Sequence, residues 1–245
     1  MLKGEEVLQA VLMADSFTVR LRPITAEKPK VLLPLVNLPM LDYTLEFLAA
    51  GGVKEIFVFC CSHARQIENY LKQSKWSTLS PQLKVQAIVS EKCQSAGDAL
   101  RDLANLNIIK GDFVLCSGDV ISNIKLDKVV NAHKARVAQD KNNIMTVVMK
   151  KAAPAHRTRT LDDDTVVVID RQTGQLLLYD NDYQGHHVEL DTTNFESHSD
   201  VQVRYDLMDS HIDICSPEVL ILFQDNFDWA DLRKDFIRGV LGSEI

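Results

Sequence analysis

The sequence lacks the long apolar segments that membrane and secreted proteins carry. No run approaches the ~18 apolar residues of a membrane span. Near the start of the chain, Glu5 and Glu6 precede an apolar stretch of eight residues, whereas a signal peptide has a basic start and a longer apolar run. We therefore expect a cytosolic protein that does not contact a membrane.

The sequence also lacks a cysteine framework. Its five cysteines are odd in number, include the adjacent pair Cys60-Cys61, and show neither CxxC spacing nor a disulfide pattern. This usage indicates a reducing compartment. A reactive thiol needs a nearby basic group, and only His63 follows closely, so we expect Cys60 and Cys61 to be buried rather than reactive.

An excess of basic residues is missing as well. The chain has 27 Lys and Arg against 34 Asp and Glu, for a net charge of −7. Binding to nucleic acid requires several Lys and Arg side chains to neutralise phosphates, so we expect no direct nucleic-acid partner. With 245 residues, of which 46% are hydrophobic, the chain is long enough for a packed core.

Short apolar runs alternate with amphipathic stretches over the first 150 residues, which is typical of a βαβ protein. Strands are expected at Val7 to Ala14, Glu55 to Cys60, Leu83 to Val89, Phe113 to Cys116 and Ile144 to Met149. Helices are expected at Met40 to Ala50, His63 to Gln73, Gly97 to Leu106 and Leu126 to Gln139. The pattern predicts a buried, mainly parallel sheet covered by helices.

From Thr165 onward the alternation of apolar runs and amphipathic stretches gives way to paired β-type runs. The strings VVVID and LLLYD flank a turn with Thr173-Gly174, which predicts a β-hairpin. Val201 to Cys215 is expected to continue as strand, and Ser216 to cap a helix that begins at Pro217. Two short helices should close the chain. We interpret residues 1–245 as one α/β domain with a β-rich C-terminal extension rather than two independent domains.

Several of these strings resemble the nucleotide-sugar pyrophosphorylases. In that family the first strand enters a glycine-rich loop, and a proline-lysine segment and a helix with Tyr-x-Leu-Glu follow. A later strand ends in Gly-Asp. The matching residues here are Arg20-Leu21, Pro29-Lys30, Tyr43 to Glu46, Val114 to Asp119 and His211 to Leu220. The resemblance implies a Rossmann-like nucleotidyltransferase fold with a mixed, mainly parallel sheet.

The glycine-rich loop itself does not match. Asp15, Ser16 and Thr18 stand where the family has glycines that let backbone N–H groups approach phosphates. At ~5 Å from a phosphate, and at an effective dielectric constant of ~20, the Asp15 charge alone would cost roughly 3 kcal/mol. We therefore expect the loop to bind a nucleoside triphosphate poorly and the chain not to be a nucleotidyltransferase.

The family's magnesium ion and phosphate contacts are only partly represented. The resemblance implies a metal held by two aspartates, and Asp119 matches the first, while the chain ends before the second. Asp119 is thus a vestigial metal ligand or a polar residue that closes a strand. Arg20 and Lys30 match phosphate contacts, and the alternative is that they form salt bridges or face solvent. We expect no metal and no cofactor.

An altered loop on a transferase scaffold also characterises the gamma and epsilon subunits of eukaryotic translation initiation factor two-B, and the epsilon family resembles this chain more closely. The matching blocks are Val31 to Leu35, Asp42 to Leu48, Phe57 to Cys61, Gly97 to Asp102, Gly118 to Asn123, Val203 to Leu207, His211 to Pro217 and Asp225 to Asp228.

This resemblance implies a subunit of a guanine nucleotide exchange factor that acts on translation initiation factor two. The implied partners are the other subunits, especially a gamma-type subunit, and the GTPase subunit of the substrate. It also implies truncation on the C-terminal side, without the family's β-helix and helical-repeat exchange domain. The rival interpretations are an active pyrophosphorylase and a purely structural subunit.

In the epsilon family an Asn-Phe pair contacts the GTPase subunit, and Asn226-Phe227 matches it. An exposed Phe would supply an apolar anchor and Asn a directed hydrogen bond. The alternative is that Phe227 is a hydrophobic staple on a helix that Asp228 caps. The residues themselves leave both interpretations open.

Overall fold

The computed structural model describes residues 7–15, 21–77, 83–153, 156, 157, 159, 165–181, 188, 190 and 192–242. The chain forms two compact units, residues 1–147 with 211–227 and residues 148–210 with 228–245. The grouping of residues 1–245 into one α/β domain stays a prediction. Among the described helices, none is long and apolar enough to cross a membrane.

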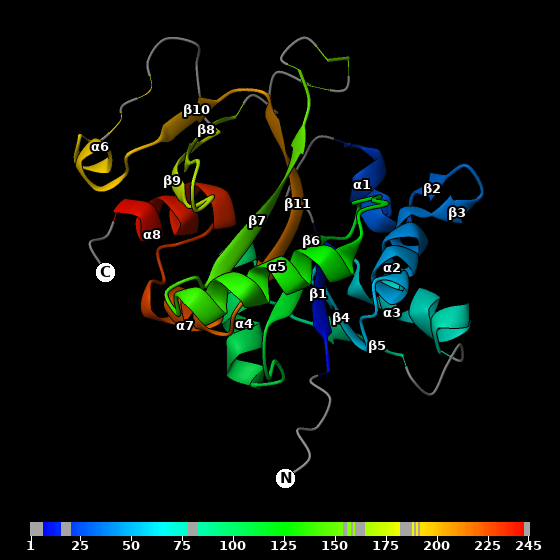
Figure 1. Ribbon diagram of the computed structural model, residues 1–245. Helices are drawn as coiled ribbons and strands as arrows, with labels where there is room; N and C mark the ends of the chain where they lie inside the picture. Colours follow the sequence, from blue (N-terminus) through cyan, green and yellow to red (C-terminus); the bar gives the residue numbers. More distant parts are fainter. Residues whose placement is uncertain are drawn as a thin grey trace. The chain divides into compact units, whose positions relative to one another are not determined.

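A six-stranded sheet with the order β5-β4-β1-β6-β11-β7 organises the first unit (Figure 1). Strands β5, β4, β1 and β6 are parallel, and β11 runs antiparallel to β6. The expected mixed, mainly parallel sheet is therefore confirmed. The strands are β1 (Gln9–Met13), β4 (Glu55–Cys60), β5 (Lys84–Val89), β6 (Phe113–Ser117), β7 (Met145–Lys151) and β11 (Leu207–Cys215), of which β7 and β11 continue into the second unit.

Helices cover both faces of this sheet, as right-handed βαβ connections require when the strand order reverses after β5 (Figure 1). Helix α2 lies against the start of α5, while α4 packs on α7. The helices of this unit are α1 (Ile24–Glu27), α2 (Met40–Ala50), α3 (Ala64–Gln73), α4 (Ala96–Leu106), α5 (Leu126–Gln139) and α7 (Glu218–Asp225). A short hairpin joins β2 (Pro34–Leu35) and β3 (Leu38–Pro39).

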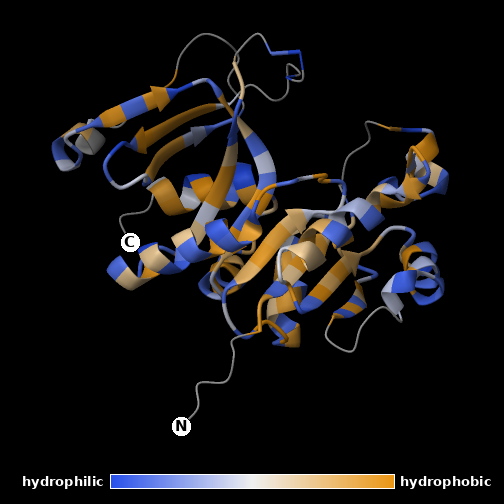
Figure 2. Cartoon of the chain, turned by 45° about the vertical axis from the view of Figure 1, so that its right-hand side comes forward, coloured by the Kyte–Doolittle hydropathy of each residue, from blue (hydrophilic) through white to orange (hydrophobic). Residues whose placement is uncertain are grey.

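The core lies along the middle strands, which are apolar on both faces (Figure 2). Four of the five residues of β1 and of β6, and five of the six residues of β4, are buried. A parallel strand covered by helices on both sides has no solvent face, which explains its continuous rather than alternating hydrophobicity. This core fixes the strand ends, where the loops of the candidate site begin.

The second unit contains the expected hairpin, β8 (Val166–Asp170) and β9 (Leu176–Asp180), in a three-stranded antiparallel sheet with β10 (Val201–Arg204). Gly174 makes the turn with a φ of 74°. Arg233 and Asp209 form a buried ion pair, and the hydroxyl of Tyr179 donates to the same carboxylate at 2.8 Å. The helical elements are α6 (Thr193–Ser197), a π-helical turn (Leu232–Ile237) and α8 (Arg238–Gly242).

Two local expectations near the end of the chain are wrong. The segment Val201 to Cys215 is two strands in different sheets, because the chain leaves β10 after Arg204 and begins β11 at Leu207. Ser216 does not cap α7, since Pro217 occupies the cap position and makes no side-chain capping bond. The hydroxyl of Ser216 is buried without a hydrogen-bond partner.

Gly118, after β6, allows the close approach on which the candidate site depends. A Cβ atom there would lie 2.7 Å from Val31, 2.8 Å from Leu12 and 3.0 Å from the carbonyl oxygen of Met13. The Gly118 N–H donates to that same oxygen at 2.8 Å, so the backbones of the two strand ends touch. No side chain fits between them.

The variant Gly118→Ala is expected to unfold more easily than the natural chain, by about 1–3 kcal/mol, because the added methyl group forces β6 away from β1. Gly242→Ala is the matched control, since a Cβ at Gly242 meets nothing within 4 Å. Urea denaturation of both variants measures the difference. Equal stability of the two variants would contradict the proposed close packing.

Candidate functional site

The candidate site lies at the carboxyl edge of the parallel sheet, where ligands bind in open α/β proteins. Asp15 follows β1, Cys61 and Ser62 follow β4, and Asp119 follows β6. These three strands are neighbours in the order β4-β1-β6, so their loops leave the sheet side by side. The predicted residues Ser16, Thr18 and Arg20 lie outside the described residues.

The carboxylate of Asp15 binds the start of the neighbouring loop. Its Oδ2 atom accepts hydrogen bonds from the backbone N–H groups of Cys61 and, at 3.0 Å, of Ser62. His63, the next residue, has a left-handed conformation with a φ of 55° and precedes the first residue of α3. Successive N–H groups at such a bend form an anion-binding concavity. Asp15 is therefore an internal anion on two of the backbone donors at this bend.

Partial burial raises the pKa of Asp15, and the hydrogen bonds from Cys61 and Ser62 with the nearby His63 offset that rise only in part. The ionised carboxylate thus makes a net unfavourable contribution at neutral pH. Because the folded-state pKa lies above the unfolded one, stability from this group increases as the pH falls through the folded-state pKa.

Lys30 and Asp119 form an ion pair at the end of β6. The other carboxylate oxygen of Asp119 accepts a hydrogen bond from the hydroxyl of Ser117. Burial alone would raise the pKa of Asp119, but the bonds from Lys30 and Ser117 outweigh burial and hold that pKa below its ordinary value. Asp119 is therefore a charged carboxylate whose two oxygens both have partners.

This arrangement does not fit a resident magnesium ion. Magnesium requires oxygen ligands in an octahedron, and here the ammonium group of Lys30 occupies the side of Asp119 that a cation would take. Within the described ranges, no three His, Cys, Asp or Glu side chains gather closely enough to hold a metal. The donor set at the end of β6 is that of an ion pair.

Thr44 holds the loop that carries Asp119, a role that sequence reasoning missed. Its buried hydroxyl lies 3.0 Å from the carbonyl oxygen of Gly118 and 2.9 Å from that of Val120. Asp42, two residues earlier, accepts hydrogen bonds from Tyr70 and Trp76 at 2.8 Å each. The helix that contains Tyr43 to Glu46 thus supports the site through buried polar contacts. The available signal in the sequence was the presence of polar residues among the apolar residues of this helix.

Phe227 is 80% exposed and directly follows Asn226, the residue that ends α7. The Nδ2 group of Asn226 donates to the carbonyl oxygen of Leu222 at 3.0 Å and closes the last turn. A ring this exposed is not buried as a hydrophobic staple is, which favours the partner-contact alternative. Asp228 is not a cap either: the next helical turn begins at Leu232 with Asp231 as its cap.

Arg101 fixes the end of α7, which the sequence did not predict. Its guanidinium group donates to the carbonyl oxygens of Phe223 and Asn226 at 3.3 and 3.4 Å. A positive charge at the last carbonyls of a helix satisfies them and interacts favourably with the helix dipole. Arg101 also pairs with Asp98 at 2.8 Å, and this bond holds the pKa of Asp98 below its usual range.

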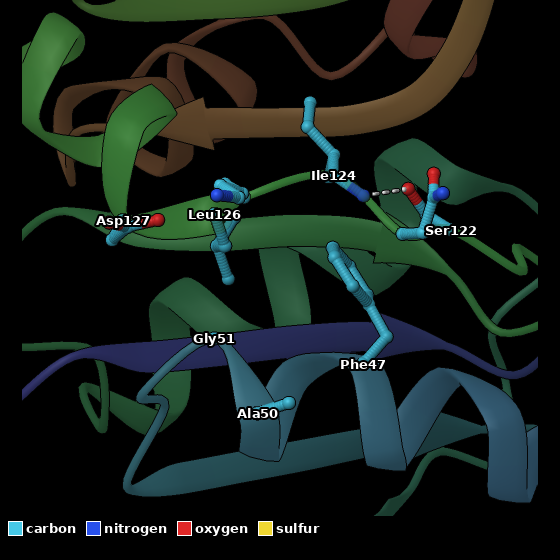
Figure 3. Close-up of a pocket in the computed structure, with 9 residues that line it drawn as sticks. Phe47, Ala50, Gly51, Ser122, Ile124, Leu126 and Asp127 are labelled. Atoms are coloured by element: carbon cyan, nitrogen blue, oxygen red, sulfur yellow. Dashed lines mark hydrogen bonds between the residues drawn. The ribbon is translucent and has the colours of Figure 1, made fainter.

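A pocket of about 220 Å³ lies elsewhere, between the end of α2 and the segment before α5 (Figure 3). A hydrogen bond of 3.2 Å from the Ile124 N–H to the Ser122 hydroxyl shapes one wall. The lining residues are Phe47, Ala50, Gly51, Ser122, Asn123, Ile124, Lys125, Leu126 and Asp127. Since none of the predicted site residues lines it, this pocket does not belong to the candidate site.

The fold and the strand-end loops define a class of protein. The sequence pattern of the nucleotidyl transferase family matches residues 9–157, which is more than half of the chain. The chain belongs to this family. A solved structure of HddC from Yersinia pseudotuberculosis has the same fold, with a TM-score of 0.65 at 16% identity over 95% of this chain and 86% of that one.

Within the family, the chain is most informatively compared with two relatives. Translation initiation factor eIF2B subunit epsilon from Dictyostelium discoideum is 53% identical over 244 residues, and the same subunit from Schizosaccharomyces pombe is 48% identical over 244 residues. The alignments cover 100% and 99% of this chain but 34% and 36% of the relatives. The chain thus spans about a third of their length, and the predicted resemblance is confirmed.

Two variants of Asp15 are expected to separate what its hydrogen bonds contribute to stability from what its charge contributes. Asp15→Ala leaves two N–H groups without their acceptor and should lose about 1–2 kcal/mol of stability. Asp15→Asn keeps an acceptor without a buried charge and should equal or exceed the natural chain at neutral pH, with an advantage that shrinks as the pH falls.

Chemical denaturation at several pH values measures all three chains. If Asp15→Ala proved as stable as Asp15→Asn, the carboxylate would not be holding the loop after β4.

Proposed function

We propose that this chain is a catalytically degenerate nucleotidyltransferase-like domain of a guanine nucleotide exchange factor subunit, active in complex assembly and substrate docking in the cytosol. The exchange factor would promote replacement of GDP by GTP on translation initiation factor two. Identity of 48–53% to the epsilon subunits across the whole chain is the observation that carries this proposal.

The geometry of the strand-end loops supports the loss of nucleotidyl transfer. Transfer depends on positive groups and backbone donors that are free to receive the phosphates of the substrate. In this chain Asp15 takes the donors after β4, and Lys30 is paired with Asp119. A nucleotide would have to break these contacts and approach the Asp15 charge. The loss of the contacts would offset much of its binding free energy.

The end of α7 supports a docking role. An aromatic ring that is 80% exposed offers a compact apolar anchor, and anchors of this kind dominate binding energy when a partner buries them. The backbone beneath Phe227 is held by Asn226 and Arg101, which lowers the entropy lost on binding. We propose that this ring contacts the GTPase subunit of the substrate.

The proposed partners are the sister subunits of the exchange factor, in particular one of gamma type, together with the GTPase. Exchange breaks no covalent bond. It requires that the factor bind the nucleotide-poor form of the GTPase more tightly than the GDP form. In this scheme the chain contributes affinity for the substrate, and no cofactor takes part.

Family membership makes an active pyrophosphorylase the rival function. With GTP or UTP, a sugar 1-phosphate and magnesium, the chain is expected to release no pyrophosphate above background in a coupled assay. The control is Asp119→Ala, which removes the carboxylate a transferase would need. Turnover in the natural chain that disappears in this variant would reject the degenerate assignment.

For docking, Phe227→Ala in the intact exchange factor is expected to weaken binding of the GTPase by about thirtyfold, since loss of a buried aromatic anchor costs roughly 2 kcal/mol. GDP release should slow correspondingly, and Asn226→Ala should have a smaller effect in the same direction. Surface plasmon resonance and nucleotide-release kinetics measure both.

Phe195→Ala is the matched control, because Phe195 is 55% exposed on α6. It should leave binding and release unchanged. If Phe227→Ala behaves like this control, the chain has no docking role at that ring and the purely structural alternative is favoured.

A further inference from the structure

Helix α7 has one face in the core and one face in solvent. Its residues Val219, Leu220 and Phe223 are buried, and the helix packs on α4 (Figure 1). Ile221 lies on the opposite face and is 53% exposed. A single exposed aliphatic residue is ordinary in a soluble protein, so its meaning depends on the residues around it.

Ile221 shares its face of α7 with two carboxylates. Glu218 precedes it by three positions and Asp225 follows it by four, and both spacings place side chains on the same side of a helix. Glu218 and Asp225 are both exposed. Gln224 contacts α4 instead, where its Nε2 group donates to the Oδ1 atom of Asn105 at 2.9 Å. The solvent face of α7 therefore presents an aliphatic side chain between two acidic ones.

This face leads directly to the exposed ring of Phe227, which follows Asp225 by two residues in the same compact unit. From Ile221 to Asn226, where α7 ends, the helix axis rises roughly 8 Å at about 1.5 Å per residue. A protein interface of standard size covers about 800 Å² on each partner. One partner that buries the ring can therefore reach Ile221 as well.

The backbone that carries this face is held in place by its own chain. Arg101 donates to the carbonyl oxygens of Phe223 and Asn226, and Asn226 donates to that of Leu222. Together with the bond between the side chains of α4 and α7, these contacts fix the last turn of the helix. A surface that is ordered before binding loses less entropy when a partner covers it.

We propose that Glu218, Ile221, Asp225 and Phe227 form one docking face, with Ile221 as its second apolar anchor. The inference rests on the proposed docking function and names the chemistry of the GTPase surface that fits: an apolar pocket bordered by Lys or Arg side chains. The two anchors supply affinity when they are buried. The carboxylates accelerate encounter with a basic surface and disfavour an acidic one.

Ile221→Ala in the intact exchange factor is expected to weaken binding of the GTPase about fivefold. The effect is smaller than for the ring, because a side chain that is half-exposed in the free chain has less apolar area left to bury. It should appear mainly in the dissociation rate constant, which surface plasmon resonance measures. Val203→Ala is the matched control, since Val203 is 57% exposed on β10, and it should bind normally.

Asp225→Lys tests the charge of the docking face. Its association rate constant with the GTPase is expected to fall several-fold at about 50 mM salt and to approach the natural value at about 0.5 M salt, where screening limits charge effects to about 4 Å. Glu91→Lys makes the same change of charge at an exposed residue after β5 and should have little effect. An equal loss in both variants would contradict a local role for Asp225.

Three outcomes overturn this inference, and they differ in what they leave standing. If Ile221→Ala binds like Val203→Ala while Phe227→Ala binds weakly, the second anchor is wrong and the proposed function stands. If Ile221→Ala dissociates the exchange factor in native mass spectrometry but keeps its GTPase affinity, the face belongs to a sister subunit. Normal binding by Phe227→Ala would reject the proposed docking role and the docking face with it.

Discussion

Internal pairing of charge at the carboxyl edge of the parallel sheet is the constraint on which the candidate site depends. Carboxylates near the centre of an α/β protein must find donors, because an unpaired charge in a partly buried place is costly. Asp15 finds them on the backbone after β4, and Asp119 finds them on Lys30 and Ser117. Both carboxylates thus pair with groups of this chain.

Packing at the same edge of the sheet holds the fold beneath these charged groups. Gly118 keeps the ends of β1 and β6 close, and Thr44 holds the loop that carries Asp119. Arg101, on α4, fixes the end of α7 and thereby the backbone that carries the exposed Phe227.

The spacing of apolar residues along the chain predicted most strands and helices correctly, because both kinds of element follow from that spacing. The bounds Met40–Ala50 and Glu55–Cys60 agree with the prediction residue for residue. The break between β10 and β11 was missed, since two consecutive strands in different sheets share one apolar pattern. A helix cap at Ser216 was predicted from residue type alone. The direction of its side chain depends on the packing around α7, which residue type does not reveal.

The sequence predicted which residues lie at the candidate site, but it did not predict the groups with which they pair. The Asp15 substitution was visible as a charge, but its bonds to Cys61 and Ser62 join residues that only the folded sheet brings together. The same holds for Lys30 with Asp119 and for Arg101 with α7. Sequence motifs gave no sign that Phe227 is exposed rather than a staple, because both interpretations use the same residues.

The central proposal is that the described strand-end groups satisfy one another and that the chain therefore binds a nucleotide poorly. Equilibrium dialysis of labelled GTP against the chain, with magnesium present, tests it most directly. The account predicts no saturable binding up to about 1 mM GTP, which corresponds to less than roughly 4 kcal/mol of binding free energy. Saturable binding in the micromolar range that Asp119→Ala or Lys30→Ala abolishes would contradict it.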